Sequence, residues 1–300
     1  MTEYRIIKPS VGRINEKDNL KRIELAGRVC YKSEGKITED SATKFCEQII
    51  KRGHTSVMEH SNLIVSVPET RIAPMIIDAM ALYRNVTGAK SHLQSEHLID
   101  HNAVLFSGNM RAWYETIGIG SSALTFSKHP ILDVNDLVDL TPYIISEEAL
   151  TPSQRYNHSR ITLRIVCDRG VSHELVRHRA MSFSQESTRY VNYGKKGYTF
   201  VEPWWWEDQN GILKSCMLGA IQDSVRAYDE MLNNGATPQL ARAVLPNQIK
   251  TEVVVTATPN QWGGFLALRM DSAAHPDMQR VARMVHEALG NDAPPRKLDS

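Results

Sequence analysis

Residues 173–190 restrict the structure and function of this chain more than any other segment. Their sequence, HELVRHRAMSFSQESTRY, holds three arginines, two histidines and three serines in eighteen positions. Guanidinium groups bind phosphate or carboxylate in a fixed geometry that lysine ammonium groups do not provide, and serine hydroxyls suit phosphate oxygens. A solvated basic helix end is the simpler alternative, but the segment contains no lysine. We therefore expect the fold to gather these side chains around an anion.

The neighbouring segments predict the local structure of this stretch. Residues 161–167 alternate as a strand does, and residues 171–178 have the spacing of a helix. The stretch would then occupy a helix end and the loop after it, where side chains and free amides can converge on a ligand. Further along, residues 252–257 indicate a buried strand, and a helix that carries Arg269 follows it.

Composition excludes several classes of protein. A hydrophobic content of 42% in 300 residues is ample for a core, and a net charge of +1 gives no overall attraction to nucleic acid or to a membrane. We find neither a signal-peptide pattern nor an apolar run that could span a bilayer. The cysteines lack a CxxC pair, which favours reduced thiols in the cytoplasm. They are Cys30, Cys46, Cys167 and Cys216.

The histidines do not have the spacing of metal ligands. His54 and His60 are not an i, i+4 pair, and His173 and His178 are five residues apart, about 140° around a helix. Neither pair can bind one metal ion from one helix face. We therefore predict no metal site.

Three segments resemble the flavin-dependent thymidylate synthases. The long signature of that family is matched by Arg177-His178-Arg179, seven residues, Ser187, and then Arg189-Tyr190. Residues 53–60 (GHTSVMEH) lie upstream, and residues 241–247 (ARAVLPN), continuing to Arg269, lie downstream in the matching order. Together the similar regions cover about 30–66 and 160–288. Residues at about 67–160 look like an insertion.

The resemblance implies an enzyme that methylates dUMP to dTMP. The family uses 5,10-methylenetetrahydrofolate as carbon donor and NADPH-reduced FAD as hydride donor. C5 of uracil is a poor nucleophile, and no cysteine lies in the three motifs to add to C6. Activation must then be electrostatic, through a guanidinium beside the pyrimidine. The matching position makes Arg269 that catalytic residue.

The resemblance also implies the ligand contacts. Residues expected to bind the flavin are His54, Ser56, Arg177, His178, Arg179, Gln185, Thr258, Asn260 and Gly264. Residues expected to bind the nucleotide are Glu174, Arg177, Gln185, Glu186, Ser187, Thr188, Arg189, Arg242 and Arg269. Ser187 has no recognisable base partner, so we interpret it as a binding hydroxyl rather than a nucleophile.

Two departures from the family put contacts in doubt. Glu174 stands where the family often has Gln, and an ionised carboxylate accepts hydrogen bonds but does not donate them. After the 252–257 strand the family commonly has Asn, one residue and Arg, whereas this chain has Thr258-Pro259-Asn260. A weaker or rearranged flavin contact is expected there, and Gly264 offers only backbone.

The expected fold is α+β, a mostly antiparallel or mixed sheet flanked by helices, in a single domain over 1–300 with the insertion. The resemblance implies a homotetramer whose active sites are shared between subunits. Two alternatives stay open: a non-catalytic nucleotide- or RNA-binding protein that retains the anion site, and a histidine-rich metal hydrolase. Flavin uptake and metal analysis would distinguish them.

One internal similarity lies partly in the insertion. Residues 107–113 (SGNMRAW) echo residues 258–262 (TPNQW), and each follows an apolar strand. The echo is short, and chance alone could produce it.

Overall fold

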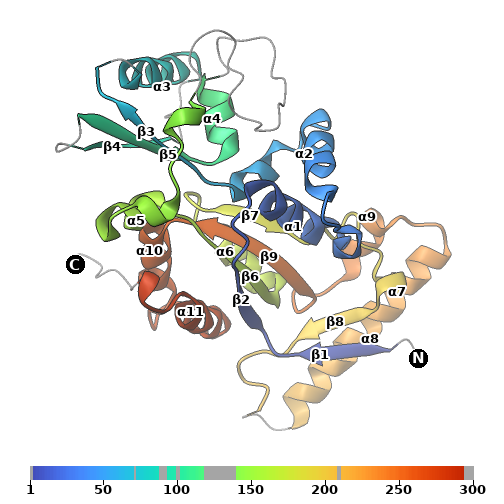
Figure 1. Cartoon of the computed structure of the whole chain (residues 1–300). Coiled ribbons are helices and arrows are strands. Elements are labelled where there is room, and N and C mark those ends of the chain that lie inside the picture. The colour runs from blue at the N-terminus through green and yellow to red at the C-terminus, as the bar shows by residue number, and fades with distance from the viewer. Residues whose placement is uncertain are drawn as a thin grey trace.

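The computed structural model describes residues 3–70, 72–87, 93–98, 102–117, 140–207 and 211–293. Helices surround three separate β-sheets (Figure 1). The expected α+β class with mostly antiparallel strands is confirmed, although the strands do not form one sheet. No helix in the described ranges is long and apolar enough to cross a membrane.

The central sheet is antiparallel and has the order β2-β6-β9-β7. Its strands are β2 (Ser10–Ile14), β6 (Ile161–Asp168), β9 (Lys250–Ala257) and β7 (Ser182–Gln185). Alternate side chains of β9 enter different cores. Val253 and Val255 belong to a cluster with Trp262 and Phe265, whereas Val254 belongs to one with Phe45. Strand β9 is therefore buried on both faces, which explains its continuous run of valines at 253–255.

Helices cover both faces of the central sheet (Figure 1). One layer consists of α6 (Arg169–Leu175), α10 (Pro259–Arg269) and α11 (Pro276–Leu289). The other consists of α1 (Asn19–Tyr31), α2 (Ser41–Lys51) and the 3-10 helix η2 (Thr55–His60). The short α5 (Pro152–His158) precedes β6 and packs on α10. This arrangement places the end of α10 against α6, where the site described below is formed.

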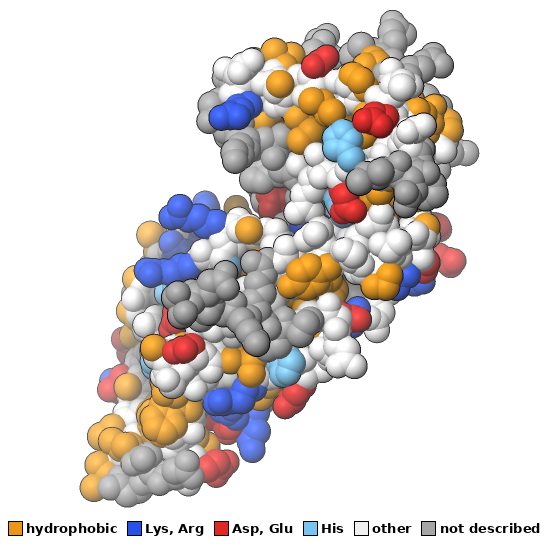
Figure 2. Space-filling view, turned by 90° about the vertical axis from the view of Figure 1, so that its left-hand side faces the viewer, with side chains coloured by type: hydrophobic (Ala, Val, Ile, Leu, Met, Phe, Trp, Pro, Cys, Tyr) orange, Lys and Arg blue, Asp and Glu red, His pale blue; other side chains and the backbone are white. Residues whose placement is uncertain are grey.

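A second antiparallel sheet, β3-β5-β4, lies above the central sheet in Figure 1. Its elements are β3 (Leu63–Pro68), α3 (Ala73–Thr87), β4 (Gln94–Leu98), β5 (Ala103–Gly108) and α4 (Met110–Ile117). It has its own hydrophobic core around Val65, Phe106 and Trp113. In the space-filling view it forms an upper lobe, and the molecule narrows where that lobe meets the rest (Figure 2).

The third sheet pairs β1 (Tyr4–Ile7) in parallel with β8 (Tyr198–Val201). It packs with the long helix α8 (Gly211–Asn233) around Tyr198, Phe200 and Tyr228. Two short helices, α7 (Tyr193–Lys196) and α9 (Pro238–Ala241), complete this part. The remaining 3-10 helices are η1 (Glu34–Lys36), η5 (Thr141–Tyr143), η6 (Glu147–Ala149), η7 (Arg242–Val244) and η8 (Gly290–Asp292).

The structure corrects one expectation about residues 173–190. Only the first residues of the stretch are helical, and residues 182–185 form β7 instead of a loop, because they pair with β9. The strands at 161–167 and 252–257 and the helix carrying Arg269 are confirmed. Much of the expected insertion, residues 118–139, lies outside the described residues.

Candidate active site

Arg269, at the end of α10, is held by three hydrogen bonds against the end of α6 and against His178 of the signature. Its NH1 donates to Glu174 Oε2 at 2.9 Å, its NH2 to the Glu174 carbonyl oxygen at 3.1 Å, and its Nε to His178 Nε2 at 3.0 Å. A guanidinium has five N–H groups, so two donors remain for a ligand. The fold therefore joins two motifs that lie more than ninety residues apart.

His178 is held in its neutral form. Its Nε2 accepts the hydrogen bond from Arg269, and its ring contacts Phe265 edge to face, with 5.0 Å between the ring centres. Burial, and then the positive charge of Arg269, lower the pKa of His178 to about 4. At neutral pH the imidazole therefore orients the guanidinium without adding a competing positive charge.

The upstream motif reaches the signature through aromatic side chains. Tyr31 Oη lies 3.0 Å from His54 Nδ1, and the Tyr31 ring lies 5.3 Å from that of Tyr190. The guanidinium of Arg189 lies 5.5 Å from the centre of the Tyr190 ring. His54 and Arg189, predicted to bind flavin and nucleotide respectively, are thus exposed ends of one connected row.

The downstream motif also meets the signature. Arg242 NH1 donates to Thr188 Oγ1 at 3.4 Å, and the backbone N–H of Ser187 donates to the carbonyl of Cys30 at 3.0 Å. The turn after β7 is thereby anchored both to the end of α1 and to the segment after α9. The structure brings Ser187, Thr188, Arg189 and Arg242 together, as the predicted nucleotide pocket requires.

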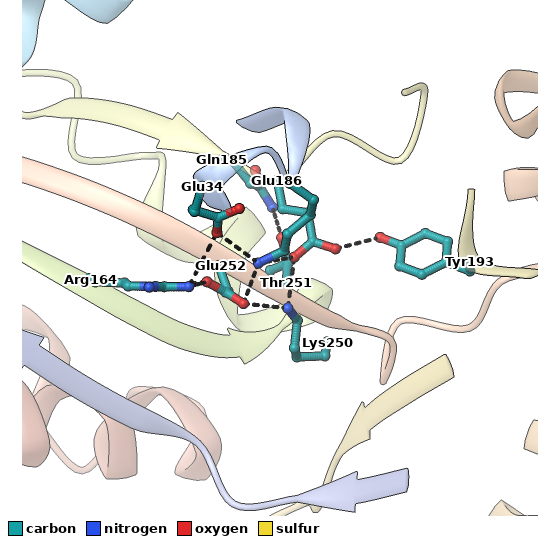
Figure 3. A network of polar contacts seen from close by, with 9 residues as sticks. Glu34, Arg164, Gln185, Glu186, Tyr193, Lys250, Thr251 and Glu252 are labelled. Carbon is teal, nitrogen blue, oxygen red and sulfur yellow. Dashed lines mark hydrogen bonds and ion pairs between the residues drawn. The ribbon is translucent and has the colours of Figure 1, made fainter. Parts of the chain in front are cut away.

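Glu186 belongs to a buried ion-pair network (Figure 3). Its Oε2 lies 2.8 Å from Lys250 Nζ and 3.4 Å from Lys32 Nζ, and Tyr193 Oη donates to its Oε1 at 3.1 Å. Glu252 contacts the same two lysines. These partners were not found from the sequence. A glutamate within the apolar run 252–257 was the available signal.

The predicted flavin residues occupy different environments. Gln185 Nε2 donates to Ser172 Oγ at 2.8 Å and to Thr251 Oγ1 at 3.1 Å. Thr258 caps α10 by accepting from the backbone N–H of Gln261. Asn260 Nδ2 donates to Asn157 Oδ1 at 2.7 Å, while its own Oδ1 is buried without a partner in the described part of the chain.

Ser56, Arg177 and Arg179 are exposed. Among the residues that the structure describes, no side chain accepts a hydrogen bond from the guanidinium of Arg177 or Arg179. Arg179 lines a cavity of about 470 Å³. A Cβ added at Gly264 would meet nothing within 4 Å, so the space beside α10 is open. These observations fit a site with room for an anionic ligand, although each residue's assignment to flavin or nucleotide stays a prediction.

His60 makes a testable contribution to stability. Its ring is fully buried, with Nδ1 2.8 Å from Thr256 Oγ1 and Nε2 2.9 Å from Ser184 Oγ. Burial, and then the charge of Arg22, lower its pKa to about 3. Below the unfolded pKa of about 6.5 the unfolded chain binds a proton that the folded chain refuses, so acidification lowers the free energy of unfolding.

We therefore expect the thermal midpoint of the wild-type protein to decrease as the pH is lowered from 7 to 5. The His60→Gln variant, which can retain both hydrogen bonds, should be less stable at pH 7 but should lose less stability over the same pH range. Other titrating groups are common to both proteins, so the difference isolates His60. Parallel pH profiles would show that His60 does not contribute in this way.

Residues that could bind a metal ion do not cluster in the described ranges. No group of three His, Cys, Asp or Glu side chains there has a suitable arrangement.

Comparisons with known proteins match most of the chain to one family. A family model described as thymidylate synthase complementing protein matches residues 14–74 and 121–295. Residues 75–120, within the expected insertion at about 67–160, are outside that match. The insertion's limits and the single-domain organisation stay predictions.

Several curated proteins are similar over part of the chain. A flavin-dependent thymidylate synthase of Corynebacterium efficiens is 34% identical over 141 residues, covering 42% of this chain and 55% of that protein. The protein of that name from Geobacter sulfurreducens is 30% identical over 148 residues, covering 48% and 62%. The one from Pyrococcus furiosus is 30% identical over 139 residues, covering 45% and 57%. The chain thus spans little more than half the length of these relatives.

Proposed function

Because the chain belongs to the family of the thymidylate synthase complementing protein, we propose that it converts dUMP to dTMP by reductive methylation. In this proposal 5,10-methylenetetrahydrofolate supplies the carbon, and NADPH-reduced FAD supplies the hydride. The observation that carries it is the contact of Arg269 with Glu174 and His178. That contact holds a guanidinium with free donors beside the signature segment.

Arg269 is proposed to activate the pyrimidine. Negative charge develops on the uracil ring when N3 is ionised and C5 attacks, and a preorganised cation at that ring lowers the barrier. Glu174 orients the guanidinium through a charge-assisted hydrogen bond. His178, being neutral, accepts a third hydrogen bond and orients the guanidinium without placing a second positive charge beside it.

The nucleotide is proposed to bind along the turn after β7. Ser187, Thr188 and Arg189 lie there beside Arg242 and offer hydroxyl and guanidinium donors suited to phosphate. Glu186 is proposed to act from within the lysine network, which fixes the position of the turn. Gln185 would complete the pocket from the end of β7.

A flavin dinucleotide suits the residues that are present. Arg177 and Arg179 have exposed guanidiniums, Asn260 has a buried oxygen without a described partner, and the space beside Gly264 is open. His54, Ser56, His178, Gln185 and Thr258 would complete the contacts. Bound FAD supplies the hydride chemistry that no side chain can supply. We further propose a homotetramer with shared sites, acting in the cytoplasm, where its four free thiols would stay reduced.

Flavin binding tests this proposal directly. The purified protein should take up FAD, and Arg177→Ala should weaken FAD binding about ten- to hundredfold, since a charge-assisted contact contributes about 1.5–3 kcal/mol. Affinity for dUMP should change less. Arg226→Ala, which removes an exposed arginine paired with Asp223 on α8, is the matched control and should bind FAD normally. A protein that binds no FAD would contradict the proposal.

We also expect every cysteine to be dispensable for the reaction. Burial raises the pKa of the Cys30 and Cys167 thiols, and raises that of Cys46 to about 12, so these groups are poor nucleophiles at neutral pH. Cys216 is exposed on α8. Single Cys→Ser or Cys→Ala variants that fold and bind flavin should retain appreciable dTMP formation. Loss of turnover in one of them would overturn electrostatic activation.

A further inference from the structure

Two parts of the chain have the same sheet topology. We call η2, β3, α3, β4, β5 and α4 the first unit, and α5, β6, α6, β7, β9 and α10 the second unit. In each unit two antiparallel strands flank a third, in the orders β3-β5-β4 and β6-β9-β7. The middle strand in each leads within two residues into a helix, α4 or α10.

The strand registers align residue by residue. Ser107 of β5 is opposite Ile64 and Gln94, and Thr256 of β9 is opposite Thr162 and Ser182. Ser107 is therefore the equivalent of Thr256. Counting along the helices from there places Arg111 at the position of Asn260 and Trp113 at that of Trp262.

Both tryptophans and both helix caps confirm this alignment. Trp113 Nε1 donates to the carbonyl of Leu63, the first residue of β3, at 3.2 Å, and Trp262 Nε1 donates to that of Ile161, the first residue of β6, at 3.1 Å. Asn109 caps α4 as Thr258 caps α10, each accepting from the backbone N–H three residues later. The echo between residues 107–113 and 258–262 is thus structural, although the register aligns the tryptophans rather than the asparagines.

A histidine before each unit's first strand reaches the sheet of the other unit. His60 Nδ1 lies 2.8 Å from Thr256 Oγ1, and His158 Nδ1 lies 2.7 Å from Ser107 Oγ, the equivalent residue. The other ring nitrogens contact Ser184 and Glu96, which are also equivalent. Such a reciprocal exchange is the mark of a two-fold contact between copies.

The two units have kept complementary functional residues. His-Ser stands at 60–61 and again at 158–159, and in each case one residue separates it from the strand, β3 or β6. The second unit has the Arg-His-Arg triplet, but Asn260 occupies the place where its family commonly has arginine. The first unit lacks the triplet, yet it has Asn109-Met-Arg111, the Asn-residue-Arg order that is missing from the second.

A cavity of about 470 Å³ lies between the units and is lined by both. Such a volume is within the range of ligand pockets. Three arginines, Arg111, Arg160 and Arg179, line it together with Glu59 and Glu115. The buried Nε of Arg160 and the buried Oε1 of Gln94, another lining residue, have no hydrogen-bond partner among the described residues. Buried polar atoms of this kind are expected to form a hydrogen bond with a ligand or an ordered water molecule.

Arg111 is positioned to act as an anion donor. Its NH1 donates to Glu59 Oε1 at 2.7 Å and its Nε to Glu115 Oε1 at 2.6 Å. These are its acceptors within the described ranges, so they fix the guanidinium and leave three of its five N–H groups. The equivalent Asn260 contacts Asn157, the equivalent of Glu59, in the same way but carries no charge.

We propose that the first unit is a diverged copy of the second, packed on it as a partner subunit would be, and that its Arg111 binds the diphosphate of FAD in the cavity between them. This inference rests on the proposed function, because Arg179 belongs to the triplet assigned to the flavin. Planar guanidinium forks from both units match phosphate oxygens better than single ammonium groups would. Arg111 of the first unit thereby supplies the guanidinium that the second unit lacks at Asn260.

The test compares Arg111→Ala with Glu115→Gln. Arg111→Ala should weaken FAD binding about ten- to hundredfold while leaving affinity for riboflavin, which has no phosphate, and for dUMP unchanged. Glu115→Gln breaks the ion pair between Arg111 and residue 115 but keeps the guanidinium. The FAD affinity of this variant should therefore equal or exceed that of the wild type. Arg111→Gln, which can still hydrogen-bond to both glutamates, provides the measurement if the alanine variant does not fold.

The outcomes separate this inference from the proposed function. If wild-type protein binds no FAD, the proposed function fails and the inference fails with it. If wild type binds FAD and the Arg111 variants bind it equally well, only the inference fails. An equal loss in Glu115→Gln and in the Arg111 variants, or an equal loss for riboflavin, would mean that Arg111 only supports the structure.

Discussion

Replacing Arg269 by lysine should lower single-turnover methylation by about 10²–10³, the usual effect of losing one preorganised donor at a developing anion. Affinity for dUMP should fall by much less, because the guanidinium meets charge that builds up mainly in the transition state. Lysine retains the positive charge but lacks the planar fork. It therefore cannot reproduce the three hydrogen bonds to Glu174 and His178 while also reaching the pyrimidine.

Glu174→Gln is the matched control for this prediction. Glutamine, which the family often has there, can still accept from Arg269 NH1, so the guanidinium should stay in place and turnover should change far less than in Arg269→Lys. If Arg269 serves only to hold α10 against α6, the lysine variant should instead be less stable with normal turnover. Thermal midpoint, dUMP affinity and single-turnover rate, measured on both variants, decide the matter.

Replacing Glu252 by glutamine should lower the free energy of unfolding by about 3–5 kcal/mol, the cost of breaking a buried ion pair on one side. Glu252 is 7% exposed and contacts Lys32, Lys250 and Arg164. Burial alone would raise its pKa, but the hydrogen bonds and charges of Lys250 and Lys32 outweigh burial and lower the pKa to about 2. Among the described residues Glu252 is the carboxylate that contacts all three cations, and a neutral amide would leave only Glu186 and Glu34 to balance them (Figure 3).

Denaturant unfolding at one fixed protein concentration measures this effect. The control is Asp223→Asn, which breaks an ion pair whose side chains are more than two-thirds exposed and which should leave stability nearly unchanged. Equal stability losses in the two variants would show that burial does not set the contribution of Glu252. Because Glu186 shares both lysines, the Glu252 variant should also disturb the turn that carries Ser187.

The residues of the site could be predicted from the sequence better than their contacts. The resemblance identifies Glu174, His178 and Arg269, but it assigns Glu174 and Arg269 to the nucleotide and His178 to the flavin, and it gives no contact between them. Their mutual hydrogen bonds depend on how α10 packs on α6, and such packing has no sequence period. Lys32 and Lys250 were missed for a similar reason, since single charged residues far apart in the chain show no pattern until the sheet brings them together.

In the fold, too, elements that depend on distant partners could not be predicted from the sequence. Strand β9 was recognised because burial on both faces gives it a continuous valine run, and β6 was recognised because its apolar residues alternate with polar ones. The strand β7, with the sequence Ser-Phe-Ser-Gln, has little strand propensity and exists because β9 offers it a partner. The similarity of the first and second units appears in the sequence only as the short echo between residues 107–113 and 258–262. The units share strand register and reciprocal histidine contacts, but few identical residues.

We propose that this chain methylates dUMP with reduced flavin and without a cysteine nucleophile. The most direct test of this reaction is an anaerobic incubation of the FAD-loaded protein with NADPH, 5,10-methylenetetrahydrofolate and dUMP, followed by analysis of the nucleotides. We expect dTMP to form, to require every one of these components, and to form in the Cys→Ser and Cys→Ala variants as well. A folded, FAD-bound and NADPH-reduced protein that leaves dUMP unchanged would contradict the proposed reaction.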